Sequence, residues 1–368
     1  MAALKRIICT VTNDLTFDQR MQRICNTLAE AGYSITLVGR ALPTSLPLPE
    51  RPWQQVRLRC RQHKGFAFYA EFNLRLFFFL LKTPFDAVAV TDTDTLLAGT
   101  LASLLRQKQR VFDAHEYFTE VPEVVHRPLV KTFWKMVERL CLPFYRYAYT
   151  VGPALAAIFT QQYGIPFAVV RNMPFQRQKQ AGLPQKRILL YQGALNEGRG
   201  IETAIAAMPL LPDEFELHLA GEGDLSDRLR RLATGQEERI HFHGYIRPEA
   251  LRALTDTAWI GINLLEHRGQ SYYYSLANKF FDYVQARVPV VTMKFPEYAA
   301  LQREFPVALL MDTLDATHLA QRLTALHQHP EEYLQMQSAC DAAAGVWHWE
   351  NEKKTLLNVW GKALPQHP

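Results

Sequence analysis

The sequence predicts an α/β protein made of two doubly wound domains that face a cleft. Short apolar runs alternate with longer amphipathic stretches, which is the pattern of parallel sheets covered by helices on both faces. The alternation occurs twice, on either side of a polar segment that contains glycine and proline. With 368 residues, 48% of them hydrophobic, each half is long enough to bury its own core.

Residues 1–170 are predicted to form the N-terminal domain. The strands expected there are Arg6–Val11, Ser34–Val38, Ala87–Val90, Arg110–Phe112 and Ala148–Val151. Helices are expected between them, for example at Asp18–Ala31 and Thr95–Leu105. The apolar start runs directly into Thr12, Asn13 and Asp14, so we interpret it as a first strand and not as a secretory signal.

Residues 171–186 have linker composition, and residues 187–345 are predicted to form the C-terminal domain. Its expected strands are Arg187–Gln192, Glu216–Ala220, Ile240–His243, Trp259–Leu264 and Val288–Thr292. Its expected helices are Gly200–Met208, Leu225–Ala233, Pro248–Thr255 and Asn278–Ala286. In residues 346–368, apolar side chains recur at helical spacing, so we expect a last helix that packs back toward the N-terminal domain.

The bulk composition favours a cytoplasmic protein. The five cysteines are scattered and form no CxxC pair, which indicates reduced thiols instead of a disulfide framework or a cysteine zinc site. The longest apolar run, Leu76–Leu81, is far shorter than the roughly 20 residues that span a bilayer. The protein is therefore expected not to cross a membrane, although it can still lie on the inner face of one.

The positive charge is concentrated in the first half. The net charge is +5, and residues 1–170 hold 20 Lys and Arg residues against 13 Asp and Glu residues. Two segments there, Arg57–Lys82 and His126–Tyr147, mix basic with aromatic residues, which favours docking on an anionic membrane surface. The alternative is two amphipathic helices whose aromatic faces belong to the core. No recognition motif supports nucleic acid as a partner.

Three strand–loop–helix turns in the second half suit a nucleoside diphosphate. Gly193–Gly200 follows a strand, and its glycines let backbone amides approach a phosphate while Arg199 adds a cation. Gly221-Glu222-Gly223 is a second such turn, close to a dinucleotide pattern. On a helix from Asn278, Asp282 lies one turn along and can accept hydrogen bonds from a ribose diol. Taken singly, each turn is equally compatible with an ordinary strand–helix connection.

In this order, the turns resemble the donor domain of retaining glycosyltransferases of family 4, which have the two-domain, Rossmann-like GT-B fold. Gly193–Gly200 resembles their G-R-L-x-x-x-K-G motif, Phe242–Tyr245 their F-x-G-x strand end, and Asn278–Tyr283 their N-K-L-F-E-Y helix. The resemblance implies that the donor is held by Gly193, Arg199, Gly221, Gly223, Tyr245, Ile246, Ala277, Asn278, Lys279 and Asp282. Departures from the family pattern are Ala194 for arginine, Arg199 for lysine, Asp282 and Tyr274 for glutamates, and Arg287 for glycine.

The first half resembles the acceptor side of the same family. Thr12–Arg20 is similar to its D-x-R loop, which implies acceptor-side roles for Asp18 and Arg20, although Asp18 also suits a helix cap. Phe112–Glu116 is similar to its D-x-H-D/E segment, which implies that His115 and Glu116 are catalytic. The alternative for His115 is a residue that caps a buried turn. Thr91–Thr95 makes a similar strand end, which we interpret as a helix cap.

The function predicted from these features is transfer of a sugar from a nucleoside diphosphate sugar to a sugar or lipid-linked acceptor, in cell-surface glycan or glycolipid synthesis. The resemblance implies retention of configuration. No metal and no cofactor are expected, because the turns supply their own cations. Two alternatives stay open: a sugar-nucleotide 2-epimerase of the same fold, and a nucleotide-sugar-binding protein without catalytic activity.

Overall fold

The computed structural model describes residues 4–178 and 186–366. The chain divides into two compact units, Met1–Asn172 with Glu352–Pro368, and Met173–Asn351. This division falls within the predicted linker of residues 171–186, of which residues 179–185 lie outside the described part. Residues from the C-terminal end thus belong to the same unit as the N-terminal half of the chain.

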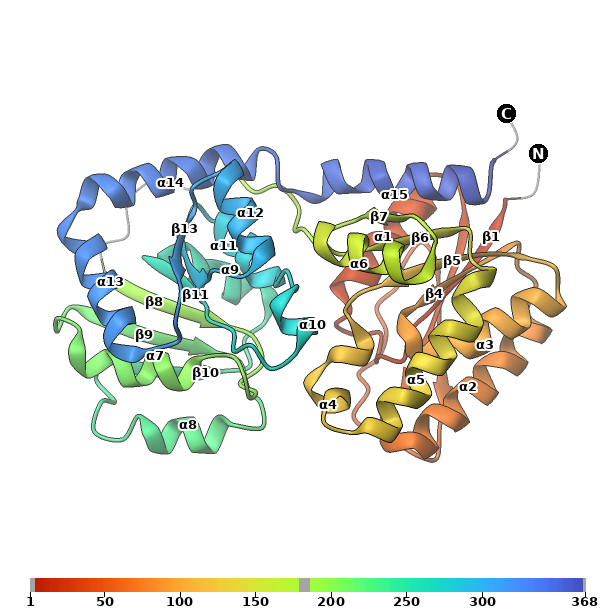
Figure 1. The fold of residues 1–368 in the computed structure, drawn as a ribbon, viewed down its shortest axis with the longest axis horizontal. Coiled ribbons are helices and arrows are strands. Elements are labelled where there is room, and N and C mark those ends of the chain that lie inside the picture. The colour runs from red at the N-terminus through yellow and green to blue at the C-terminus, as the bar shows by residue number, and fades with distance from the viewer. Residues whose placement is uncertain (1–3, 179–185, 367–368) are drawn as a thin grey trace. The chain divides into compact units, whose positions relative to one another are not determined.

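A seven-stranded parallel sheet in the order β3-β2-β1-β4-β5-β6-β7 forms the centre of the first unit (Figure 1). Its strands are β1 Arg6–Thr10, β2 Ser34–Ala41, β3 Gln54–Arg59, β4 Ala87–Thr91, β5 Gln109–Ala114, β6 Tyr147–Thr150 and β7 Phe167–Val169. The strand order reverses between β1 and β4, so the first unit is doubly wound as predicted, and ligands of such sheets bind where the order reverses.

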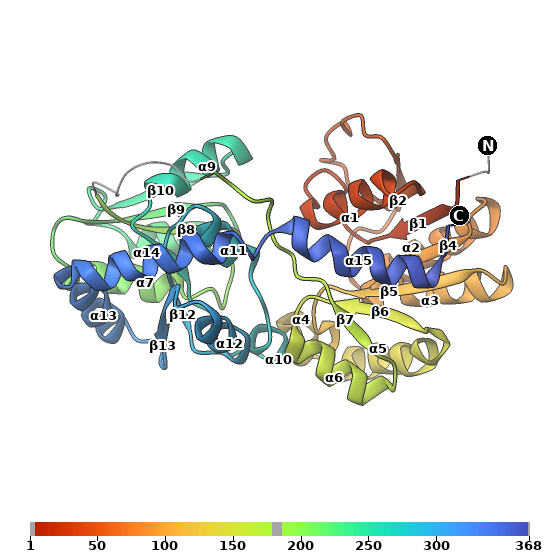
Figure 2. The ribbon, with the colours of Figure 1, turned by 90° about the horizontal axis from the view of Figure 1, so that it is seen from above.

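Helices cover both faces of this sheet. They are α1 Gln19–Glu30, α2 Gly65–Lys82, α3 Asp92–Leu105, α4 Pro122–Val125, α5 Pro128–Cys141, α6 Pro153–Tyr163 and, from the end of the chain, α15 Trp349–Ala363. Helices α2, α3 and α5 lie side by side on one face (Figure 1). Helix α15 returns across the other face (Figure 2), where Tyr33 donates a hydrogen bond to the Leu364 carbonyl at 2.9 Å.

The second unit contains a six-stranded parallel sheet in the order β10-β9-β8-β11-β12-β13. Its strands are β8 Arg187–Gln192, β9 Phe215–Ala220, β10 Ile240–Gly244, β11 Ile260–Asn263, β12 Val290–Met293 and β13 Ala308–Met311. Its helices are α7 Ile201–Ala207, α8 Ser226–Leu232, α9 Pro248–Thr257, α10 Gln270–Tyr273, α11 Asn278–Gln285, α12 Pro296–Glu304, α13 Ala316–Gln328 and α14 Pro330–Ala344.

Helix α11 is fixed to the sheet of the second unit by Tyr283. A side chain at Gly261 of β11 would have its Cβ only 2.2 Å from the Tyr283 ring, so the absence of a side chain there lets the ring lie against the strand. The buried Tyr283 hydroxyl donates to the Leu190 carbonyl at 2.7 Å and accepts from the Gln192 amide at 3.1 Å. These contacts set the position of Lys279 and Asp282, which α11 also carries.

Among the described residues, no helix is long and apolar enough to cross a membrane. All five cysteines are free in the structure.

Candidate active site

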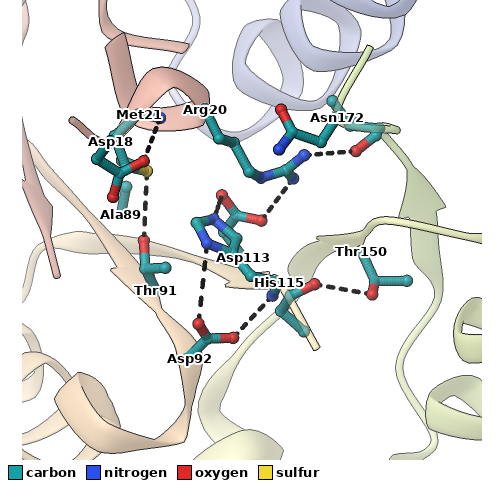
Figure 3. Close-up of polar contacts among 12 residues, drawn as sticks. Asp18, Arg20, Met21, Ala89, Thr91, Asp92, Asp113, His115, Thr150 and Asn172 are labelled. Carbon is teal, nitrogen blue, oxygen red and sulfur yellow. Dashed lines mark hydrogen bonds and ion pairs between the residues drawn. The ribbon is translucent and has the colours of Figure 1, made fainter. Parts of the chain in front are cut away.

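Four polar side chains gather at the carboxyl end of the first unit's sheet, where the strand order reverses (Figure 3). Asp92 follows β4, Asp113 and His115 lie at the end of β5, and Arg20 extends from α1. Because carboxyl ends of parallel strands meet at one edge of a sheet, residues 20, 92 and 115 become neighbours despite their separation in sequence.

His115 lies between two carboxylates. Its Nε2 is 2.8 Å from Asp113 Oδ2, and its backbone amide donates to Asp92 Oδ1 at 2.7 Å. The other ring nitrogen, Nδ1, is 3.8 Å from Asp92 Oδ2, which is beyond hydrogen-bonding distance. The His115 side chain retains 18% of its exposure. Nδ1 is therefore the ring nitrogen that makes no hydrogen bond to either carboxylate.

Burial and charge set opposite protonation preferences for the two carboxyl groups. Burial raises the pKa of Asp92 to about 7, although His115 opposes the shift. Asp113 is also buried, but Arg20 and His115 outweigh burial and hold its pKa below the ordinary value. Burial alone would lower the pKa of His115, but Asp113 and Asp92 outweigh it and raise that pKa. The cluster thus favours a charged imidazole beside an ionised Asp113.

Asp92 is a site residue that the sequence analysis interpreted as part of a helix cap. Its backbone φ is +53°, a left-handed conformation that is uncommon outside glycine and that clusters at functional sites. This conformation at the start of α3 accompanies the hydrogen bond between the Asp92 carboxylate and the His115 amide. The signal available in the sequence was a polar residue directly after a buried strand, the same signal that singled out His115.

The remaining predicted residues of the first unit differ in exposure. Asp18 caps α1, as its alternative interpretation held, by accepting from the Met21 amide at 3.0 Å. Arg20 is buried, and its guanidinium donates to Asp113 and to the Val170 carbonyl, both at 2.9 Å. Glu116 is exposed. Arg20 therefore positions Asp113, and the acceptor-side roles of Asp18 and Arg20 and the catalytic role of Glu116 stay predictions.

In the second unit, the predicted glycine turns lie directly against one another. The Gly193 amide donates to the Ala220 carbonyl at 2.9 Å, and the Gly221 amide donates to the Gly244 carbonyl at 2.8 Å. A Cβ at Gly221 would lie 1.9 Å from the Gly193 carbonyl oxygen, and the φ of Gly221 is +147°. Glycine is required at this position, because both the conformation and the space exclude a side chain.

Arg199 and Lys279 bring two basic side chains to these turns. The Lys279 ammonium lies 3.6 Å from the centre of the Tyr191 ring, and the Arg199 guanidinium lies 4.9 Å from that of Tyr272. Burial, reinforced by the charge of Arg199, lowers the pKa of Lys279 well below its ordinary value. The buried Nε of Arg199 has no hydrogen-bond partner among the described residues. An anion bound here would raise the pKa of Lys279 again and could accept a hydrogen bond from Arg199 Nε.

Asp282 lies on α11, one helical turn after Asn278. Its Oδ2 accepts from Gln192 Nε2 at 3.2 Å, and Thr255 donates to Gln192 Oε1 at 2.9 Å. The Ala277 amide is bonded to the Tyr298 hydroxyl at 2.9 Å. The structure thus orients the Asp282 carboxylate through Gln192, which the sequence analysis did not identify.

The other predicted donor-side residues lie at the same edge of the sheet. A Cβ at Gly223 would lie 2.3 Å from Asn196 Oδ1, so this turn also packs tightly against the first one. Tyr245 follows β10 and is exposed, whereas Ile246 is half-buried against the core. Their contact with a base stays a prediction.

Comparison with known families assigns the two units to glycosyltransferases. Residues 19–173 match the family described as Glycosyltransferase Family 4, and residues 186–329 match the family described as Glycosyl transferases group 1. Between them the two matches take in most of the chain. A comparison with curated protein sequences gave no match.

Solved structures of other proteins share this fold. Sucrose-phosphate synthase from Thermosynechococcus elongatus is similar over 97% of this chain and 98% of its own, with 16% identity and a TM-score of 0.78. HepE from Anabaena in complex with UDP-glucose is similar over 97% and 99%, with 14% identity and a TM-score of 0.77. WaaG, a glycosyltransferase involved in lipopolysaccharide biosynthesis, is similar over 96% and 99%, with 16% identity and a TM-score of 0.72.

The chain belongs to the GT-B glycosyltransferases, with a family 4 region in its first unit and a group 1 region in its second. The predicted fold class of two doubly wound α/β domains is confirmed.

Proposed function

We propose that this protein transfers a sugar from a nucleoside diphosphate sugar to an acceptor, with retention of configuration and without a divalent metal. The observation that carries the proposal is the cradle of the second unit, in which the Gly193 and Gly221 turns adjoin Arg199 and Lys279. The two glycine turns pack against each other at the strand ends, and the two basic side chains beside them would match the charge of a diphosphate. Retention is what the resemblance to family 4 implies.

Departure of the nucleoside diphosphate breaks the bond between the sugar's anomeric carbon and the β-phosphate oxygen. Negative charge then grows on the diphosphate, where Arg199 and Lys279 would stabilise it, as a metal ion does in other transferases. Asp282, held by Gln192, would accept hydrogen bonds from the ribose hydroxyls. In the first unit, His115 would hydrogen-bond a hydroxyl or the reacting oxygen through Nδ1, and Glu116 would assist.

The similar structures agree with a nucleotide-sugar donor and a cell-surface acceptor. HepE has been solved in complex with UDP-glucose and with UDP, and WaaG is involved in lipopolysaccharide biosynthesis. UDP-glucose is therefore the first donor to test.

An apolar face on the first unit supports a lipid-linked acceptor at an anionic membrane surface. Helices α2, α3 and α5 enclose a groove of about 410 Å³. Asn73 lies in its lining, and its side-chain amide already donates to two backbone carbonyls. Leu74 on α2 and Leu101 on α3 line the groove and are exposed, and Leu140 on α5 is 63% exposed. Part of each aromatic segment is core, because Phe72 and Trp134 are buried.

The charges around this face complement an anionic surface. Arg127, Arg139 and Arg146 flank the apolar side chains of α5, are exposed, and form no ion pair within the described part of the chain. Apolar contact together with unpaired cations is the combination that binds peripheral proteins to acidic lipids. We therefore place the acceptor on the membrane surface.

Binding of UDP-glucose and UDP, measured by calorimetry in the presence of EDTA, tests the donor site. The parent protein should bind both ligands, and Asp282→Ala should weaken binding by roughly 1.5–3 kcal/mol, the range for hydrogen bonds to a charged group. Arg199→Ala should also weaken binding. Arg228→Ala, an exposed arginine of α8, is the matched control and should bind like the parent. Equal affinity in all four proteins would contradict the proposed cradle.

A further inference from the structure

Three histidines and one glutamate gather on strands β9 and β10, which lead into the turns at Gly221 and Gly244. Glu216 and His218 lie on β9, and His241 and His243 lie on β10. The register pairs His218 with His241, so these side chains project from the same face of the sheet. Glu216 lies two residues from His218 on β9, and His243 lies two residues from His241 on β10, so alternation along each strand brings them to the same face. In the sequence, neither Glu216 with His218 nor His241 with His243 indicates a metal site. The two pairs become neighbours only through the pairing of β9 with β10.

The distances within this cluster fit a small metal ion. Glu216 Oε2 lies 3.1 Å from His218 Nε2 and 3.6 Å from His241 Nε2, and the three ligand atoms lie within 4.8 Å of one another. Ligand atoms bound to zinc at about 2.0–2.1 Å in a tetrahedron are about 3.3 Å apart. Small side-chain rotations therefore suffice to place all three atoms around one ion.

Neighbouring groups hold the ligands in a binding orientation. Lys186 engages the other carboxylate oxygen, Glu216 Oε1, at 2.8 Å, which leaves Oε2 turned toward the histidines. His243 Nε2 lies 3.1 Å from His218 Nδ1, so an Nδ1 hydrogen can be donated to His243 while Nε2 binds the ion. Such support of the second ring nitrogen is typical of metal-binding histidines. The His241 side chain retains 36% exposure and leaves a path for entry.

We propose that Glu216, His218 and His241 bind a divalent transition-metal ion, zinc in particular, with His243 orienting His218. Imidazole and carboxylate ligands together suit zinc and its neighbours in the periodic table more than magnesium or calcium. Three protein ligands leave one tetrahedral position for water. The ion would link β9 to the edge strand β10, close to the turn at Gly244. It would therefore stabilise this edge of the second unit's sheet.

The test is zinc binding to metal-free full-length protein, followed by calorimetry, with cobalt absorption as a probe of tetrahedral coordination. The parent should bind one zinc ion, and zinc should raise its unfolding temperature. His241→Gln should abolish both effects, and because the His241 side chain is 36% exposed the variant should fold like the parent, which circular dichroism checks. His243→Ala should weaken binding by about 10–100-fold, as expected for a group that orients a ligand.

The matched control is His329→Gln, because His329 also pairs with a glutamate, Glu331, at 3.2 Å, but in an exposed pair at the N-terminal end of α14. It should bind zinc like the parent. Zinc binding that is equal in the parent and His241→Gln, or equally lost in His329→Gln, would overturn the site. The readouts do not involve sugar transfer, so either result leaves the proposed function untouched.

Discussion

The imidazole of His115 shows how neighbouring residues set the orientation and protonation of a single side chain. Asp113 is kept ionised by Arg20, whereas burial raises the pKa of Asp92 to about 7. The same ring therefore faces one carboxylate that fixes Nε2 and a second that stays close to Nδ1. A group held in this way keeps one orientation without a bound substrate, which would reduce the entropy lost in the transition state if His115 is catalytic as predicted.

Lys279 allows a pH-dependent prediction at the residue scale. Burial and Arg199 lower its pKa, and a bound diphosphate would raise that pKa again, so binding should take up a proton. Affinity should consequently fall as the pH rises. Calorimetry of UDP binding in buffers of different ionisation enthalpy measures the proton directly. Lys279→Arg, which stays charged, should bind without proton uptake. Release of a proton by the parent would contradict this account.

Asp94, at the start of α3, gives a stability prediction. Burial, reinforced by Asp92, raises its pKa from 3.8 to about 7. A carboxyl group with a raised pKa stabilises the fold at low pH, and this contribution is lost as the pH rises through the folded-state value. Asp94→Asn should therefore reduce the decline in the free energy of unfolding between pH 4 and pH 8. Each pKa unit corresponds to about 1.4 kcal/mol. Parallel curves for parent and variant, from urea unfolding, would show that Asp94 does not titrate this way.

At the scale of elements, the two units differ in what lies at the carboxyl ends of their strands. In the second unit, the turns after β8 and β9 have glycines in close contact, so backbone and not side chains forms the floor of the site. In the first unit, the ends of β4 and β5 present ionisable side chains. This difference is consistent with a nucleotide held by one unit and proton or hydroxyl contacts supplied by the other.

The helical face of α2, α3 and α5 predicts membrane docking. The parent should sediment with vesicles of anionic phosphatidylglycerol at low salt, less so at high salt, and not with neutral phosphatidylcholine. Each basic residue near the surface contributes about 1 kcal/mol. Arg139→Glu and Leu140→Glu should reduce sedimentation, whereas Leu334→Glu, an exposed leucine of the second unit, should not. Equal recovery in the supernatant for every protein and lipid would mean that this face has another partner.

On the scale of the whole molecule, the sequence predicted the strands of both sheets in the described residues except β3, β7 and β13. Strand β8, a buried apolar run, has the bounds that were predicted. Strand β3 was missed because it is a half-exposed edge strand with charged residues, and β7 because it has only three residues. The last strand β13 and helices α10 and α12–α14 were also not predicted, because no recognised motif marks them.

The candidate site residues also fall into a group that the sequence identified and a group that it did not. Glycine turns and the His115 motif are local patterns, so sequence spacing identifies them. The contact of Asp92 with His115 joins residues 23 positions apart, and that of Gln192 with Asp282 joins residues 90 apart. Such pairings depend on strand order and helix packing, which spacing along the chain does not encode.

A division of labour between the two units predicts separable effects of substitution. His115→Ala should leave UDP binding unchanged, because the donor residues lie in the second unit, and should slow transfer by about 10²–10⁴-fold. Arg199→Ala should weaken UDP binding and slow transfer as well, because charge on the leaving group grows in the transition state. Comparison of dissociation constants with turnover rates distinguishes the two. A His115→Ala protein that loses UDP binding as severely as Arg199→Ala would contradict this division.

Release of nucleoside diphosphate, followed over time with and without acceptor, tests the central claim most directly. With UDP-glucose and lipid-linked or oligosaccharide acceptors, in the presence of EDTA, a glycosyltransferase releases UDP only when a suitable acceptor is added, in equal amount to the glycosylated product. UDP release that is independent of acceptor, together with a rearranged sugar, would instead identify an epimerase. Tight UDP-glucose binding without turnover across the acceptor panel would contradict transfer and leave a binding protein.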